Sequence, residues 1–134
     1  MSEFLSLGDV LALHTSMMDR LGQTPQPLRD QGALESAVMR PRMAEHYEQA
    51  DLVRQAAVFA VGICQAHAFV DGNKRTAYFA TNLFLRINGF AFTGEQMDFA
   101  RQIEAIPERT TTLDVATDAL EAWLREHVDA REAP

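Results

Sequence analysis

The chain has 134 residues, of which 47% are hydrophobic and 23% charged, and its 12 basic and 19 acidic side chains give a net charge of -7. This balance fits one soluble domain over 1–134, with a core at about 6–127, and the negative charge argues against direct nucleic-acid binding, which needs a basic face. Cys64 is the only cysteine, so no disulfide forms within the chain. No basic stretch precedes a long apolar run at the N-terminus, and no apolar segment approaches the length of a membrane span. We therefore expect a cytoplasmic protein without membrane attachment.

The first half of the chain carries ordinary signals for starting and stopping helices, and alternating strand patterns are nearly absent. The pattern of residues 42–49 is ambiguous. The other signals predict a helix from Ser6, with Asp9 completing a capping box, to Gly22, then a loop at 23–27, then a helix that Asp30 caps and Pro41 interrupts or kinks.

The two most apolar helical patterns lie in the middle of the chain. The first begins at Asp51, ends near His67 and is apolar on nearly all sides, which predicts a central, buried helix. The second begins at Asn73 and is stopped by Asn88 and Gly89. Only a short loop separates these helices, so we expect this loop to lie at the mouth of a rigid scaffold.

The last third predicts two more helices and a polar tail. Residues 90–92 are read as extended, and 94–106 show a helical pattern. Thr111 with Asp114 predicts a second capping box, and 129–134 are expected to fray. The predicted fold class is therefore all-α, a single-domain compact helical bundle.

The loop between the central helices concentrates groups that can act on a phosphate chain. His67 can exchange protons near neutral pH, because an unperturbed imidazole titrates at about 6.5. Asp71 is a hard oxygen ligand of the kind that Mg²⁺ takes alongside phosphate oxygens. Gly72 permits a positive φ or a close approach of the backbone. We assign His67 as the candidate base and Asp71 as the candidate metal ligand.

Three residues at the start of the second central helix extend this set. Asn73 is a good N-cap, and the helix it opens would direct free N–H groups and the positive end of its dipole at an anion. Arg75 can form a fork onto two phosphate oxygens, and Lys74 acts as a point charge. We predict a phosphate-binding site at Gly72, Asn73, Lys74 and Arg75, and catalytic roles for His67, Lys74 and Arg75. The alternative is a plain connection between two helices with a basic first turn.

The string from His67 to Arg75 resembles the signature of the Fic/Doc family, which reads His-x-Phe-x-Asp/Glu-Gly-Asn, then Gly or Lys, then Arg. Its lysine form is similar to the Doc (death-on-curing) toxin branch. The segment 29–37, followed by Arg40 and Pro41, resembles a region that Doc-like proteins carry upstream. The resemblance implies the Fic fold, with the active-site loop between the two central helices and a flap beside it at 42–49.

The resemblance also implies an activity. Members that transfer AMP carry glycine where this chain has Lys74, and a further arginine beyond Arg75, which this chain lacks. The lysine form implies transfer of the γ-phosphate of ATP, with Mg²⁺, to a hydroxyl of a target protein, elongation factor Tu in the Doc branch, so that translation stops. Two alternatives stay open. One is AMP transfer to another protein, and the other is a catalytically silent binding module.

Regulation is expected to come from a second protein. Self-inhibited relatives carry Ser/Thr-x-x-x-Glu-Gly/Asn, and the nearest match, 117–122, ends in alanine. The resemblance therefore implies a separate antitoxin whose disordered tail folds as a helix into a groove on the toxin.

Several other polar residues are expected to have structural roles. We expect surface or capping positions for His14, His46 and His127, because they lack ligand-type partners at helical spacing. Arg29, Glu35 and Arg40 are read first as residues of helix packing and salt bridges, with bordering of the nucleotide pocket as the alternative for each of the three.

Overall fold

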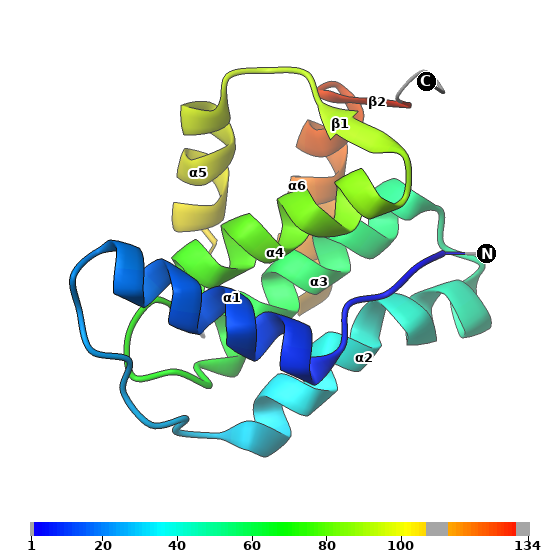
Figure 1. The fold of residues 1–134 in the computed structure, drawn as a ribbon. Helices are drawn as coiled ribbons and strands as arrows, with labels where there is room; N and C mark the ends of the chain where they lie inside the picture. Colours follow the sequence, from blue (N-terminus) through cyan, green and yellow to red (C-terminus); the bar gives the residue numbers. More distant parts are fainter. Residues whose placement is uncertain (1, 107–112, 131–134) are drawn as a thin grey trace.

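The computed structural model describes residues 2–106 and 113–130, and in these residues the protein is a helical bundle with one small antiparallel sheet (Figure 1). This confirms the predicted all-α class. The elements are α1 (Leu7–Arg20), α2 (Gln31–Glu48), α3 (Leu52–Ala66), α4 (Asn73–Ile87), β1 (Phe90–Phe92), α5 (Gln96–Glu104), α6 (Leu113–Arg125) and β2 (Val128–Ala130).

Side-chain caps start the first three helices where the sequence predicts them. Ser6 and Asp9 form a complete capping box at α1, in which each side chain accepts a hydrogen bond from the other residue's main-chain N–H. Asp30 caps α2 through the N–H of Ala33, and Asp51 caps α3. Each cap satisfies main-chain donors that a helix leaves without a partner.

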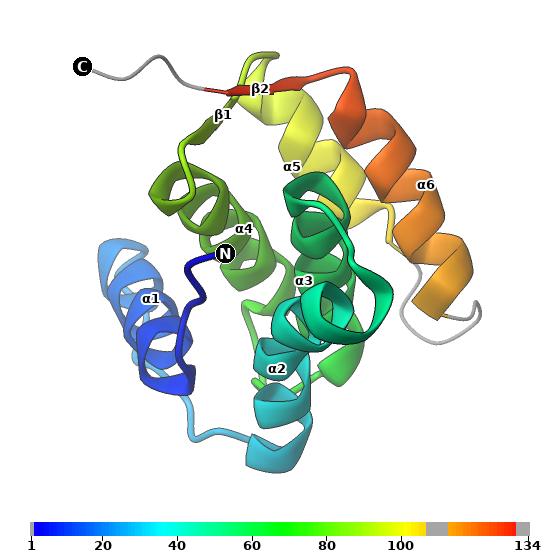
Figure 2. The same ribbon diagram turned by 90° about the vertical axis from the view of Figure 1, so that its right-hand side faces the viewer.

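Helix α3 lies at the centre of the bundle, with α2, α4 and α6 packed around it (Figures 1 and 2). Ala56, Ala57 and Ala60 are fully buried, so neighbouring helices approach α3 closely. At Gly62 an added Cβ would lie 2.8 Å from the Cδ atom of Arg40, so the glycine leaves room for that side chain of α2. The central, buried position predicted for this helix is confirmed.

Helix α2 does not have the interruption that was one of the two outcomes predicted at Pro41. The helix continues through this proline to Glu48, so Pro41 does not interrupt it. Pro41 is buried, and burial of Ala37 and Ala44 on either side outweighs the one main-chain hydrogen bond that a proline cannot donate.

The prediction of a flap at 42–49 is also wrong, because most of this segment is the last part of α2. Its Glu45 accepts hydrogen bonds from Ser2 and Gln55.

The C-terminal part closes the bundle with a short strand pair. Phe90 pairs with Ala130 and Phe92 with Val128, so the extended reading of 90–92 is confirmed, whereas residues 129 and 130 are paired and not frayed. Thr111, the predicted cap before α6, and residues 131–134 lie outside the described residues. None of the helices in the described ranges is long and apolar enough to cross a membrane.

Candidate active site

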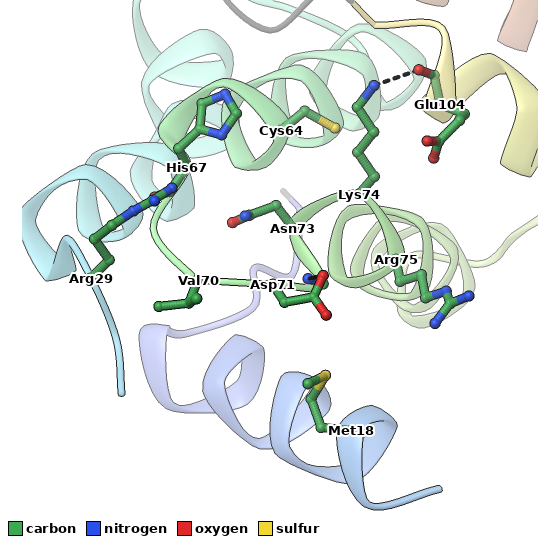
Figure 3. A pocket seen from close by; sticks show the side chains of 11 residues that line it. Met18, Arg29, Cys64, His67, Val70, Asp71, Asn73, Lys74, Arg75 and Glu104 are labelled. Carbon is green, nitrogen blue, oxygen red and sulfur yellow. Dashed lines mark hydrogen bonds between the residues drawn. The ribbon is translucent and has the colours of Figure 1, made fainter. Parts of the chain in front are cut away.

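The loop between α3 and α4 lines a cavity of about 580 Å³ (Figure 3). This volume is in the range of small-molecule sites in proteins. All six residues predicted for the site contribute to its wall. The lining residues are Met18, Arg29, Cys64, His67, Val70, Asp71, Gly72, Asn73, Lys74, Arg75 and Glu104.

His67 ends α3 in a left-handed conformation, with φ of 47°. Its carbonyl oxygen accepts two hydrogen bonds from the Arg29 guanidinium, at 3.2 Å from Nε and 3.1 Å from Nη2. A non-glycine residue at positive φ persists only where surrounding contacts impose it. Arg29 supplies such a contact. It also borders the cavity, which was the alternative role predicted for it.

The segment before α2 lies against the motif loop. Leu28 forms an isolated antiparallel bridge with Phe69, and the main-chain N–H groups of Arg29 and Asp30 both donate to the carbonyl of Ala68. Phe69 is buried, so its side chain anchors the loop in the core. The extended segment beside the site is therefore the one that ends at Asp30, and it precedes α2.

Asn73 is not the N-cap of α4, contrary to the prediction. Gly72 occupies the cap position, and the Asn73 amide closes the loop on itself. Its Oδ1 accepts from the N–H of Phe69 at 3.0 Å, and its Nδ2 donates to the carbonyl of Phe69 at 2.8 Å. The physical reason is that both ends of the amide find partners on one residue four positions earlier, which a cap at the helix start would not provide.

The conformation at Gly72 requires a glycine. Its φ is +85°, and an added Cβ would lie 2.8 Å from Cε of Met17. The prediction of a positive φ here is confirmed. The glycine N–H donates to Oδ1 of Asp71 at 2.8 Å, so that carboxylate is held beside the start of α4. A glycine cap offers no side chain to the first-turn N–H groups of α4, which leaves them to an anion in the cavity.

Asp71 is exposed on the cavity wall. Among residues 2–106 and 113–130, no group of three or more His, Cys, Asp or Glu side chains is placed to hold a metal ion. Mg²⁺ is commonly held by one or two carboxylates together with substrate phosphates and water. Asp71 would fit a metal held in this way, as the one carboxylate ligand beside phosphate oxygens and water.

The two cations of the motif diverge. The Lys74 ammonium donates to the main-chain carbonyls of Glu104 and Ile106, the latter at 3.2 Å, and so caps the C-terminus of α5. Figure 3 shows Lys74 directed toward Glu104 and Arg75 extending away from His67. Arg75 is exposed, and no hydrogen bond or ion pair to another described residue is found for it. Of the two, Arg75 is therefore the cation available to phosphate oxygens, whereas Lys74 is already bound at the cavity edge.

His14 lies under the loop, not at the surface or at a helix cap, so the expectation for it is wrong. It is 4% exposed, and its Nε2 lies 2.9 Å from the carbonyl oxygen of Asp71. Its ring is stacked on that of Phe69, with centroids 3.8 Å apart. Its partners follow more than fifty residues later in the chain, so no local spacing could reveal them.

The remaining polar residues have structural positions. His46 is exposed and His127 lies against the carbonyl of Trp123, both as expected. Glu35 pairs with Gln31 on the exposed side of α2. Burial lowers the pKa of Arg40, with Asp114 opposing that shift. At the cavity wall, burial raises the pKa of Cys64 to about 12, so its thiol stays protonated near neutral pH.

Comparison with known proteins agrees with this geometry. Residues 4–85 match the model of the Fic/DOC family. The chain is 34% identical over 126 residues to "Toxin Doc" of Mycolicibacterium smegmatis, covering 92% of each chain. It is 36% identical over 86 residues to "Protein kinase doc" of Escherichia phage P1, covering 63% of this chain and 68% of that relative. The chain belongs to the Fic/Doc family, in its death-on-curing branch.

Proposed function

We propose that this protein transfers the γ-phosphate of ATP to a hydroxyl group of a target protein, and that it acts as the toxin of a toxin–antitoxin pair. The observation that carries the proposal is that one cavity collects His67, Asp71, Arg75 and the uncapped start of α4. Phosphoryl transfer needs positioning and charge stabilisation more than covalent chemistry from the protein. A relative named as a protein kinase and another named as a toxin support this choice.

Each group has a separate task in this reaction. His67 accepts the proton of the attacking hydroxyl as general base, while the hydroxyl oxygen bonds to the γ-phosphorus, the bond to the β–γ bridging oxygen breaks and ADP leaves. The start of α4 and Arg75 bind the phosphate oxygens, the helix through its N–H groups and Arg75 through its fork of donors. Asp71, together with the phosphates, would hold Mg²⁺, which would neutralise charge on the phosphate chain. Asn73 keeps the loop closed. Gly72 adopts the positive φ with which the chain turns from Asp71 into α4.

Lys74 contributes to the choice between phosphate and AMP transfer through its position. Its side chain occupies a place that glycine leaves open in relatives that transfer AMP, and its ammonium is anchored on α5. The lysine stem thus narrows the cavity beside the first turn of α4, and the chain has no second arginine beyond Arg75 to hold the phosphates in another orientation. We take γ-phosphate transfer as the reaction on these grounds.

For the target, we propose elongation factor Tu, because the chain is similar to the Doc branch.

A second hollow, of about 370 Å³ between α1 and α4, is the proposed binding site of an antitoxin. Leu21 and Phe79, both 44% exposed, give this groove an apolar wall, and Arg20 and Arg75 give it two cations. An amphipathic helix with an acidic residue suits such a surface.

Glu121, the glutamate of the 117–122 segment, is paired with Arg54 and Arg125, so it does not serve as an internal inhibitor.

Incubation with ATP labelled at either the γ- or the α-phosphate tests the reaction. The purified protein, Mg²⁺ and purified elongation factor Tu are combined, with a bacterial lysate as a second source of targets. Label on protein from γ-labelled ATP alone is the expected result. Label from α-labelled ATP would show AMP transfer instead, and label from neither, with targets present, would identify a silent binding module.

A further inference from the structure

A buried histidine of α1 contacts the motif loop without lining the cavity. His14 is 4% exposed, and its Nε2 lies 2.9 Å from the main-chain carbonyl oxygen of Asp71. A carbonyl oxygen can only accept, so Nε2 carries the proton and donates. Because this bond fixes the main chain of Asp71, it also limits where the carboxylate of that residue can point.

Two further contacts make His14 a support for the whole turn. Its ring stacks on Phe69 at a centroid distance of 3.8 Å and an interplanar angle of 10°. A Cβ added at Gly72 would meet the His14 ring at 3.4 Å, so the ring lies directly against the glycine. The imidazole thus contacts the loop at residues 69, 71 and 72.

We propose that His14 is a positioning residue for the transfer reaction, holding the Asp71 main chain so that its carboxylate faces the phosphate site. This inference rests on the proposed function for its catalytic consequence. Residues that orient a metal ligand typically contribute about 10–100-fold to metal affinity or activity. His14 acts through Asp71 and does not reach the cavity, whose lining does not include it.

The competing explanation is that His14 fills space in the core. Two substitutions separate the explanations, because the imidazole has two separable properties. His14→Phe keeps a ring to stack on Phe69 and removes the donor. His14→Gln loses the stacking but places an amide N–H at a similar reach, so it can still donate to the Asp71 carbonyl.

The experiment measures the loop and the reaction in the same variants. Amide hydrogen exchange in the free protein reports on order at Phe69 and Gly72, whose main-chain N–H groups donate within the loop. The turnover number for transfer from ATP is measured across Mg²⁺ concentrations. We expect these amides to exchange at least tenfold faster in His14→Phe. The variant should also need about 10–100-fold more Mg²⁺ for half-maximal turnover, or its turnover number should fall by about 10–100-fold. Its thermal unfolding should stay cooperative. His14→Gln should stay within about threefold of the native protein in both readouts, even where its melting temperature falls.

Two results would overturn the proposal. One is unchanged loop exchange in His14→Phe, and the other is a loss in His14→Gln as large as in His14→Phe, since either means that the ring serves packing alone. If the native protein transfers no phosphate, the proposed function fails, but the exchange measurement still decides whether His14 orders the loop. If His14→Phe does not fold, exchange and turnover of His14→Gln decide, because only the hydrogen bond predicts that this variant keeps both.

Discussion

The ammonium group of Lys74 donates to the main-chain carbonyl of Glu104, the last residue of α5, although the two residues are thirty positions apart. The positive charge thereby lies at the negative end of the α5 dipole, and the start of α4 is tied to that helix. A residue that its sequence context marks for phosphate binding is therefore also a structural link. Its contribution to the reaction depends on where its stem lies as much as on its charge.

Replacing Lys74 tests this position directly. Lys74→Gly is expected to lose γ-phosphate transfer, because it removes both the tether to α5 and the stem beside the phosphate site. Glycine in the first turn also costs roughly 0.5–1 kcal/mol of helix stability, so Lys74→Met, which keeps the stem without charge, is the control. Mass spectrometry of the target separates a phosphate from an AMP adduct. Full phosphotransfer by Lys74→Gly would show that Lys74 does not determine the reaction.

The metal role of Asp71 can be separated from its role in the turn. Asp71→Asn keeps an oxygen that can accept from the Gly72 N–H but removes the charge that attracts Mg²⁺. We expect ATP binding to lose its dependence on Mg²⁺, measured by calorimetry with and without the metal, and Asp71→Ala to lose the turn contact as well. If Asp71→Asn binds ATP with native affinity and native metal dependence, Asp71 is only a turn residue.

Arg29 should matter for turnover more than for nucleotide binding. Arg29→Met keeps the aliphatic stem but removes both hydrogen bonds to the His67 carbonyl. A base displaced by about 1 Å can lose on the order of 100-fold in rate, so we expect kcat to fall by 10–100-fold with little change in the KM for ATP. A rise in KM with native kcat would show instead that Arg29 binds the nucleotide.

The groove between α1 and α4 predicts a selective defect in inhibition. Phe79→Asp places a negative charge on the apolar wall, where it should repel an acidic amphipathic helix. Binding of the cognate antitoxin proposed above, measured by calorimetry, is expected to weaken by at least tenfold. Tyr47→Asp, at an exposed aromatic of α2 outside the groove, is the matched control and should bind normally. Equal affinity of both variants would place the antitoxin elsewhere.

Much of the fold follows from signals that are local in the sequence. Ser6, Asp30 and Asp51 each accept a hydrogen bond from the main-chain N–H three residues later, so spacing alone predicts these caps. The interruption predicted at Pro41 does not occur, because the local penalty of a proline is offset by burial against other elements, which the sequence pattern does not display.

In the site, too, the features set by local sequence could be predicted, and those set by distant contacts could not. Its six residues lie within one short segment, so their types and order predicted that they line one cavity. The roles of Asn73 and Lys74 could not be predicted in full. The Asn73 amide depends on the backbone path of a turn, and the Lys74 ammonium on the end of a helix thirty residues later. His14 was missed for the same reason, since its contact with Asp71 exists only in the folded chain.

The most direct test of the account is the modification that the target carries after incubation with native protein or with His67→Ala, in the presence of ATP and Mg²⁺. Mass spectrometry of elongation factor Tu should show one added phosphate on a hydroxyl residue with the native protein. With His67→Ala the rate should fall by about 10²–10⁴-fold while the melting temperature stays close to native. A phosphate added at native rate by His67→Ala, or an AMP adduct from the native protein, would contradict the central claim.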